Sequence, residues 1–167
     1  MSLRYLPEHS QAAQFALDLA RKEAAHLRYS QSTLFALAID LDWVQSLGNH
    51  PEIAEKVEAF VSRFGRLQDH LGDKLLPRLA ALVGESSKTL LDTLAVAEKT
   101  GLLNSADDFI AARRLRNALV HEYMNNPQIF LESLFAAQQA CHLFFAVVDK
   151  AEEELDRLGV PRSLPFA

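Results

Sequence analysis

Apolar residues recur three or four positions apart along most of this chain, which is the spacing of an amphipathic helix. The clearest stretch begins near Glu52, and its apolar face comprises Ile53, Val57, Phe60, Phe64, Leu67, Leu71 and Leu75. Charged and amide side chains occupy the opposite face, so we expect one long helix packed on a core. Pro77 lacks an amide hydrogen and crowds the preceding turn, and we expect a kink or a break there.

Further helices are expected from the same spacing and from residues that favour helix ends. Two shorter helices are predicted over 7–28 and 32–47, and a Gly-Asn-His-Pro run at 48–51 ends the second. Another is predicted to start at residue 86 or 87 and to end at residue 100. Gly101 is well placed to cap its C-terminal end.

Two helices are predicted in the last third of the chain. The first covers residues 105–125, with Ser105 as a favourable N-cap and acidic residues in its first turn. The second covers residues 128–158 and is apolar on more than one face between Phe130 and Val148. One packing partner would not cover such a helix, which is therefore either the central helix of the bundle or a seam shared with a second subunit.

These elements predict an all-α protein with an antiparallel bundle of about six helices. The chain has 167 residues, which fits a single helical domain over 1–167 that can bury a core. It contains six glycines and six prolines, most of them between the periodic stretches. A β fold would need more frequent turns.

Charge and composition narrow the possible functions. The formal charge is −5, which argues against a protein that coats DNA through a broad basic face. A nucleic acid could then be bound only at a confined site. The single cysteine, Cys141, permits no internal disulfide and suits a reducing compartment. We see no signal peptide and no apolar run of about 20 residues, so we expect a cytoplasmic protein without membrane contact.

The most informative run is Arg113-Arg114-Leu115-Arg116-Asn117-Ala118-Leu119-Val120-His121-Glu122-Tyr123. Helical geometry places Arg114, Asn117 and His121 within about 60° of one another on one face. Arg116 and Tyr123 form a second stripe with Val120 between them. The apolar stripe expected to pack inward comprises Ala112, Leu115 and Leu119.

Arginine and histidine together suit cleavage of a phosphodiester. Arginine binds phosphate with a planar fork of donors, and histidine takes or gives a proton near neutral pH. In a ribonuclease without metal, a base removes the proton of the ribose 2′-OH, which attacks the adjacent phosphorus while donors stabilise the phosphoryl oxygens. The structural alternative is that these cations favour the helix dipole and cap its C-terminal carbonyls.

The segment from Arg116 to Tyr123 resembles the Arg-x4-His-x-Tyr signature of the HEPN superfamily, helical nucleotide-binding domains found in prokaryotes and higher eukaryotes. It is most similar to toxin-like members that pair with small nucleotidyltransferases. The segments 64–69 and 98–103 also look like bacterial HEPN proteins, and the resemblance covers about 53–158. It implies a four-helix HEPN-like core there, with the motif helix at 105–125 and additional N-terminal helices.

This resemblance implies a role for each matching residue. Arg116 and His121 match the ribonuclease pair, and Asn117 matches the polar residue that often follows the arginine. Tyr123 matches the tyrosine that the partner nucleotidyltransferase modifies with AMP in some toxins, or it lines the cleft. Arg113 and Arg114 are outside the motif, and we interpret them as phosphate or RNA contacts, with solvated charges as the alternative. In the family, two motif helices meet across a homodimer.

The leading hypothesis is therefore a homodimeric endoribonuclease toxin that needs no metal or other cofactor and leaves 2′,3′-cyclic phosphate ends. A small nucleotidyltransferase would be its antitoxin. The alternative is a binding module whose cleft holds a nucleotide, or docks a nucleotidyltransferase, without cutting RNA. A third possibility is a structural bundle whose motif is a relic.

Three weaker candidates have structural interpretations. His70 is expected on a solvated polar face, because no second histidine or cysteine lies at metal-ligand spacing. Cys141 is expected to pack as a small apolar residue. Arg63 and Arg66 either extend a basic surface toward the motif helix or are simple surface charges.

Overall fold

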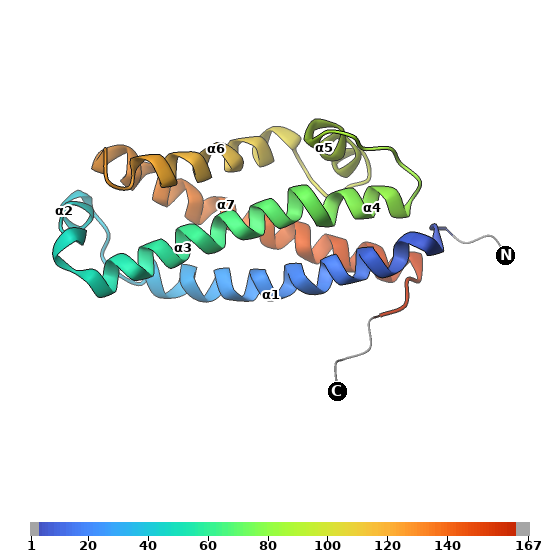
Figure 1. Cartoon of the computed structure of the whole chain (residues 1–167), viewed down its shortest axis with the longest axis horizontal. Coiled ribbons are helices and arrows are strands. Elements are labelled where there is room, and N and C mark those ends of the chain that lie inside the picture. The colour runs from blue at the N-terminus through green and yellow to red at the C-terminus, as the bar shows by residue number, and fades with distance from the viewer. Residues whose placement is uncertain (1–3, 163–167) are drawn as a thin grey trace.

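The computed structural model describes residues 4–162 and is 80% helical. Its long helices lie side by side and run alternately in opposite directions (Figure 1): α1 (Ser10–Leu34), α3 (Pro51–His70) continued by α4 (Leu76–Leu82), α6 (Ala106–Glu122) and α7 (Pro127–Leu158). The part of the chain described contains no strand. The predicted all-α antiparallel bundle is confirmed.

Shorter elements complete the bundle. The 3-10 turns are η1 (Pro7–His9) and η2 (Leu47–Asn49), and the short helices are α2 (Leu41–Gln45) and α5 (Leu90–Lys99). Figure 1 shows α2 at one end of the bundle and α5 near the other. The helix α2 contacts α7, whereas α5 contacts α4 and α6.

The N-terminal region differs from the two helices predicted over 7–28 and 32–47. The helix α1 continues without a break to Leu34, and only the five residues of α2 are α-helical between it and η2. No glycine or proline interrupts residues 10–34, and Leu27, Ser30 and Leu34 keep the same side of α1 buried. The next helix, α2, begins at Leu41 and not at residue 32. Its start is set by Asp40, whose side chain accepts a hydrogen bond of 2.8 Å from the Trp43 backbone N–H.

The kink or break expected at Pro77 takes the form of a wider helical turn. The segment η3 (Leu71–Leu75) is π-helical, and the Leu76 N–H donates to the carbonyl of Leu71, five residues back. A proline ring clashes with the carbonyl four residues earlier, so a regular α-helix would be strained where Pro77 meets Asp73. The π turn lets α3 pass into α4 without ending the rod.

The core lies where α1, α3, α6 and α7 meet, and aromatic rings join these helices. The ring centroids of Phe64 and Phe144 are 5.0 Å apart, and those of Phe109 and Phe144 are 6.0 Å apart. The helix α7 contacts α1, α2, α3 and α6, so several neighbours within the chain cover it. Cys141, on α7, is fully buried, as predicted.

By length and composition alone, α7 is also apolar enough to cross a membrane. An 18-residue window in it has a mean hydropathy of 1.3, and 44% of that window is buried inside the bundle. The sequence-based expectation of no such stretch was therefore wrong for this helix. The core helix of a water-soluble bundle has the same composition when several neighbours cover it.

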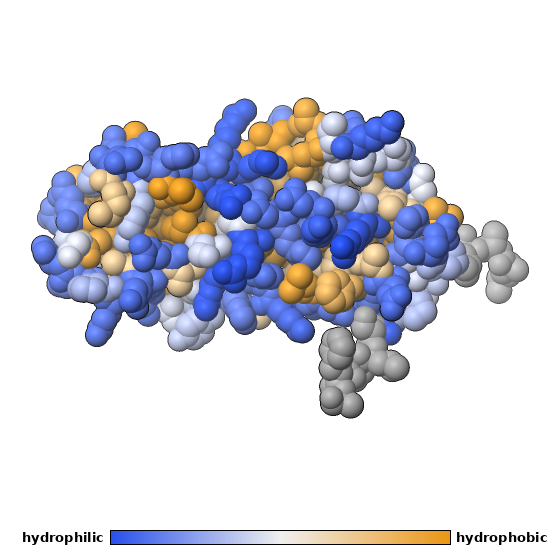
Figure 2. Space-filling view, viewed as in Figure 1, coloured by the Kyte–Doolittle hydropathy of each residue, from blue (hydrophilic) through white to orange (hydrophobic). Residues whose placement is uncertain are grey.

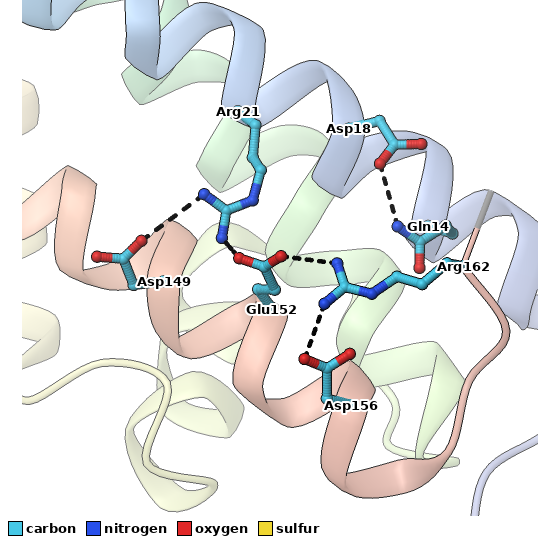
Figure 3. Close-up of polar contacts among 7 residues, drawn as sticks. All are labelled: Gln14, Asp18, Arg21, Asp149, Glu152, Asp156 and Arg162. Atoms are coloured by element: carbon cyan, nitrogen blue, oxygen red, sulfur yellow. Dashed lines mark hydrogen bonds and ion pairs between the residues drawn. The ribbon is translucent and has the colours of Figure 1, made fainter. Parts of the chain in front are cut away.

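Charged residues join the outer sides of α1 and α7. Arg21 pairs with Asp149 at 3.8 Å and with Glu152, and Glu152 also accepts from Arg162 at 2.7 Å (Figure 3). Arg162 in turn pairs with Asp156 at 2.8 Å. Arg162, which follows α7, is thereby tied back to that helix.

Helix ends in the second half of the chain largely follow the predictions. Gly101 has a φ of 81° and Gly159 has a φ of 78°, left-handed conformations that favour glycine just after α5 and α7. The predicted cap at Gly101 is confirmed. The start of α5 is later than residue 86 or 87, because Thr89 and Asp92 form a capping box there.

Candidate functional site

The helix α6 is anchored by its N-cap and by one apolar side. The Ser105 hydroxyl oxygen accepts a hydrogen bond of 3.2 Å from the Asp108 N–H, as predicted. Ala112 and Leu119 are buried and Leu115 is half-buried, so the predicted inner stripe is confirmed. The polar residues of α6 are therefore presented toward α3 or toward solvent.

Arg116 is the residue of the motif that α6 presents to α3. Its Nη1 atom donates to Asp69 Oδ1 at 2.8 Å, and both side chains remain about 40% exposed, at 40% and 39%. The two residues line a groove of about 270 Å³ between α3 and α6, here called the Arg116 groove. Its lining residues are Val61, Ser62, Gly65, Arg66, Asp69, Arg116 and Val120.

Gly65 lets the arginine side chain lie close to α3. A Cβ atom at this position would be 2.8 Å from Arg116 Nε and 3.3 Å from its Cδ and Cγ atoms. Contacts below 3.0 Å are not tolerated, so any other residue here would displace the arginine. The position of the Arg116 side chain thus depends on Gly65, which has no Cβ to keep it away from α3, and on the Asp69 carboxylate, which binds its end.

The other polar residues of the motif face solvent. Arg113, Arg114, Asn117 and His121 are all exposed. None of these side chains forms a hydrogen bond or ion pair with another residue between 4 and 162. The fold itself therefore makes no use of this basic group, although His121 contributes its backbone carbonyl to the Asn125 side chain at 2.6 Å.

The structure places Arg116 and His121 on different sides of α6. Five residues on a regular helix correspond to a rotation of about 140°. In agreement, Arg116 lies against α3, whereas His121 is exposed to solvent. The predicted stripe of Arg116, Val120 and Tyr123 does face α3, because all three line grooves along that helix. Between residues 4 and 162, no hydrogen bond or ion pair joins the side chains of Arg116 and His121, since that of Arg116 pairs with Asp69.

Tyr123 lies outside the Arg116 groove. It packs edge-to-face against Phe130, with ring centroids 5.2 Å apart, and it borders a second groove of about 400 Å³ together with Glu58 and Met124. Burial, and secondly the charge of Glu58, raise the pKa of the Tyr123 phenol. The phenol therefore stays protonated at neutral pH and serves in part as an edge of the core.

Two of the weaker candidates have structural roles. The prediction of a solvated His70 was wrong: it is buried, and its Nε2 donates to the Ala16 carbonyl on α1 at 2.7 Å. Arg63 donates to the Ser30 hydroxyl at 2.8 Å and to the His26 carbonyl at 3.2 Å, which joins α3 to α1. Arg66 lines the Arg116 groove, as one of its two interpretations required.

Sequence reasoning missed Gly65 and Asp69 as parts of this site. A glycine inside a strongly periodic helix is a signal of close approach by another group, and Gly65 is such a case. Asp69 offered no comparable signal, because its partner Arg116 lies 47 residues away. Between residues 4 and 162, no three histidine, cysteine or acidic side chains gather in a way that could hold a metal ion.

Figure 2 shows the face of the bundle on which α6 and α3 are in view. Hydrophilic side chains cover most of it, and an apolar patch lies between α6 and α3, the two helices that form the Arg116 groove. Comparison of the chain with protein-family models, with curated proteins and with solved structures finds no match. The function therefore has to be argued from the residues of the site.

Proposed function

We propose that this protein is a metal-independent endoribonuclease of the HEPN type, the toxin of a pair with a small nucleotidyltransferase, acting on RNA in the cytoplasm. The proposal rests on the polar side chains that α6 presents. This helix exposes a cluster of cationic and amide side chains that stabilise nothing in the fold, beside an arginine held in place by Asp69 and Gly65. The resemblance of this cluster to the Arg-x4-His-x-Tyr signature supports the same assignment.

In this proposal each polar residue has one task in the cleavage. His121 removes the proton from a ribose 2′-OH, and the oxygen forms a bond to the adjacent phosphorus while the bond from phosphorus to the 5′-oxygen breaks. Arg116 stabilises the charge on the non-bridging oxygens, and Asn117 orients the phosphate. The leaving 5′-oxygen takes up a proton, so the products are a 2′,3′-cyclic phosphate and a 5′-hydroxyl.

The orientation of the pair favours a homodimer. Arg116 and His121 point to different sides of one α6, so a phosphate held by Arg116 of one chain would meet His121 of a second chain. The apolar residues Val120 and Met124 flank His121 and are 60% and 82% exposed. A second copy of α6 would cover them and remove this apolar surface from water.

The test is cleavage of a mixed RNA pool in EDTA by the purified protein. We expect products with 2′,3′-cyclic phosphate ends and a loss of at least about 100-fold in rate for His121→Ala, because general acid–base catalysis contributes that much. Arg116→Gln should lose a similar factor. The matched controls are His142→Ala on α7 and Arg157→Gln near its end, both exposed and outside the site.

One observation favours the alternative of a binding module that does not cut RNA. Arg116 already donates to Asp69, and no contact within the described chain joins it to His121. If folded parent protein leaves RNA intact, or if His121→Ala cleaves as well as His142→Ala, the ribonuclease assignment is wrong. The groove would then hold a nucleotide phosphate or a nucleotidyltransferase.

A further inference from the structure

The α3 side of the Arg116 groove carries a second guanidinium group, that of Arg66. Ser62, Arg66 and Asp69 are spaced four and three residues apart, so they lie on one face of α3. Gly65, next to Arg66, is the residue over which Arg116 crosses. Two arginines from different helices therefore line one groove. Between them, Gly65 leaves the surface of α3 without a side chain.

Arg66 is held much more loosely than Arg116. Its Nη2 atom is 3.3 Å from the Ser62 hydroxyl, and its Nη1 atom is 3.9 Å from the Glu23 carboxylate, which is beyond hydrogen-bond distance. Its side chain is 55% exposed. Most of the donors of Arg66 are therefore available to a ligand, whereas Arg116 has one donor fixed on Asp69.

The charges and size of the groove suit a phosphate. Two guanidinium groups line the groove together with one carboxylate, that of Asp69, while the Glu23 carboxylate lies outside the lining at 3.9 Å from Arg66. The planar fork of arginine matches phosphate oxygens in a bidentate manner. A volume of about 270 Å³ also leaves room for a sugar attached to the phosphate.

We propose that Arg66 is a second phosphate-binding residue of the Arg116 groove and contacts the phosphate next to the scissile one along a single RNA strand. The choice of RNA, and of Arg116 for the scissile phosphate, rests on the proposed function. The second anion contact itself rests on the geometry of the groove. Loss of Arg66 should therefore raise KM for RNA and leave kcat nearly unchanged, whereas loss of Arg116 lowers kcat.

The test is binding of a short fluorescein-labelled oligo(dT), followed by fluorescence anisotropy at several salt concentrations. This strand has phosphates but no 2′-OH, so the proposed reaction cannot consume it. We expect Arg66→Gln to weaken binding about 10-fold and to reduce the slope of log Kd against log salt by about 1. Arg66→Lys should fall between Arg66→Gln and the parent, and Arg157→Gln should match the parent.

A further variant separates phosphate contact from fold stability. Glu23→Gln removes the nearest carboxylate of Arg66 but leaves Arg66 in place, and it should bind oligo(dT) at least as tightly as the parent. The inference is overturned if Arg66→Gln binds like the parent, or if the parent does not bind oligo(dT). If binding depends on Arg66 but no RNA is cleaved, the ribonuclease proposal fails and this inference stands.

Discussion

Gly65 shows how one residue without a side chain orients a charged group on another helix. Most glycines inside helices weaken them by about 1 kcal/mol relative to alanine. At this position the missing Cβ gives Arg116 a surface to lie on, and Asp69 completes the arrangement. The orientation of the arginine is therefore a property of α3 as much as of α6.

This account predicts the effect of Gly65→Ala. The added methyl group would lie 2.8 Å from Arg116 Nε, so the arginine side chain has to shift away from α3, which disturbs its hydrogen bond to Asp69. We expect a several-fold loss in affinity for oligo(dT) and in RNA cleavage, while circular dichroism shows an unchanged helical content. Gly48→Ala is the matched control, because a Cβ there would meet nothing within 4 Å. Equal affinity of the two variants would contradict the role given to Gly65.

At the scale of single residues, sequence reasoning succeeded where the cause is local. Ser105 and Gly101 were predicted as caps because a cap bonds to its own helix, within four residues. His70 was assigned wrongly because its partner is a carbonyl on α1, 54 residues away. The bond between Arg116 and Asp69 could not be predicted for the same reason.

The helices themselves were predicted best where their apolar stripes are longest. Residues 53–75 and 128–158 form helices as expected, because tertiary packing and local periodicity agree there. Residues 29–40 carry no glycine or proline, so the end of α1 has no signal in the sequence. At Pro77 only a kink or a break was expected, since periodicity does not reveal that the irregularity is a π turn.

The burial of Cys141 on α7 has a consequence for pH. Burial of Cys141 raises the pKa of its thiol from 9.0 to about 12, because the thiolate would be desolvated. A group whose pKa is raised on folding contributes stability below its unfolded pKa and loses it as pH rises. Between pH 9 and 12 the free energy of unfolding should therefore fall by about 1.4 kcal/mol per pH unit from this group.

The measurement is urea unfolding at a series of pH values for the parent and for Cys141→Ala, whose difference isolates the thiol from other titrating groups. The slope attributed to Cys141 should vanish in the variant. At pH 8 a thiol reagent should also label the native protein much more slowly than the unfolded chain. Rapid labelling of the native protein would show that α7 does not bury this residue in solution.

For the molecule as a whole, the proposed reaction depends on a second chain. The exposed apolar residues Val120, on α6, and Met124, in the turn that follows α6, lie beside the residues assigned to cleavage. We expect the parent protein to be a dimer and Met124→Asp to be a folded monomer that has lost RNA cleavage. Size-exclusion chromatography with light scattering measures the mass.

Leu91→Asp is the control for that experiment, because Leu91 is 65% exposed on α5, which lies away from the C-terminal end of α6 (Figure 1). It should remain dimeric and active. A monomeric parent that cleaves RNA would show that one chain suffices, and α6 would then have to bring Arg116 and His121 onto one phosphate by itself.

The π turn between α3 and α4 has a consequence for comparing this chain with others. A hydrogen bond from Leu76 to Leu71 encloses one residue more than the ordinary helical turn. The rod thus contains, in effect, a one-residue insertion that changes which sides of α3 and α4 face the core. A relative with a straight helix at this place should align with a single-residue gap within 71–75. Without that gap, core residues of α3 would align with core residues of the relative, but core residues of α4 would align with surface residues.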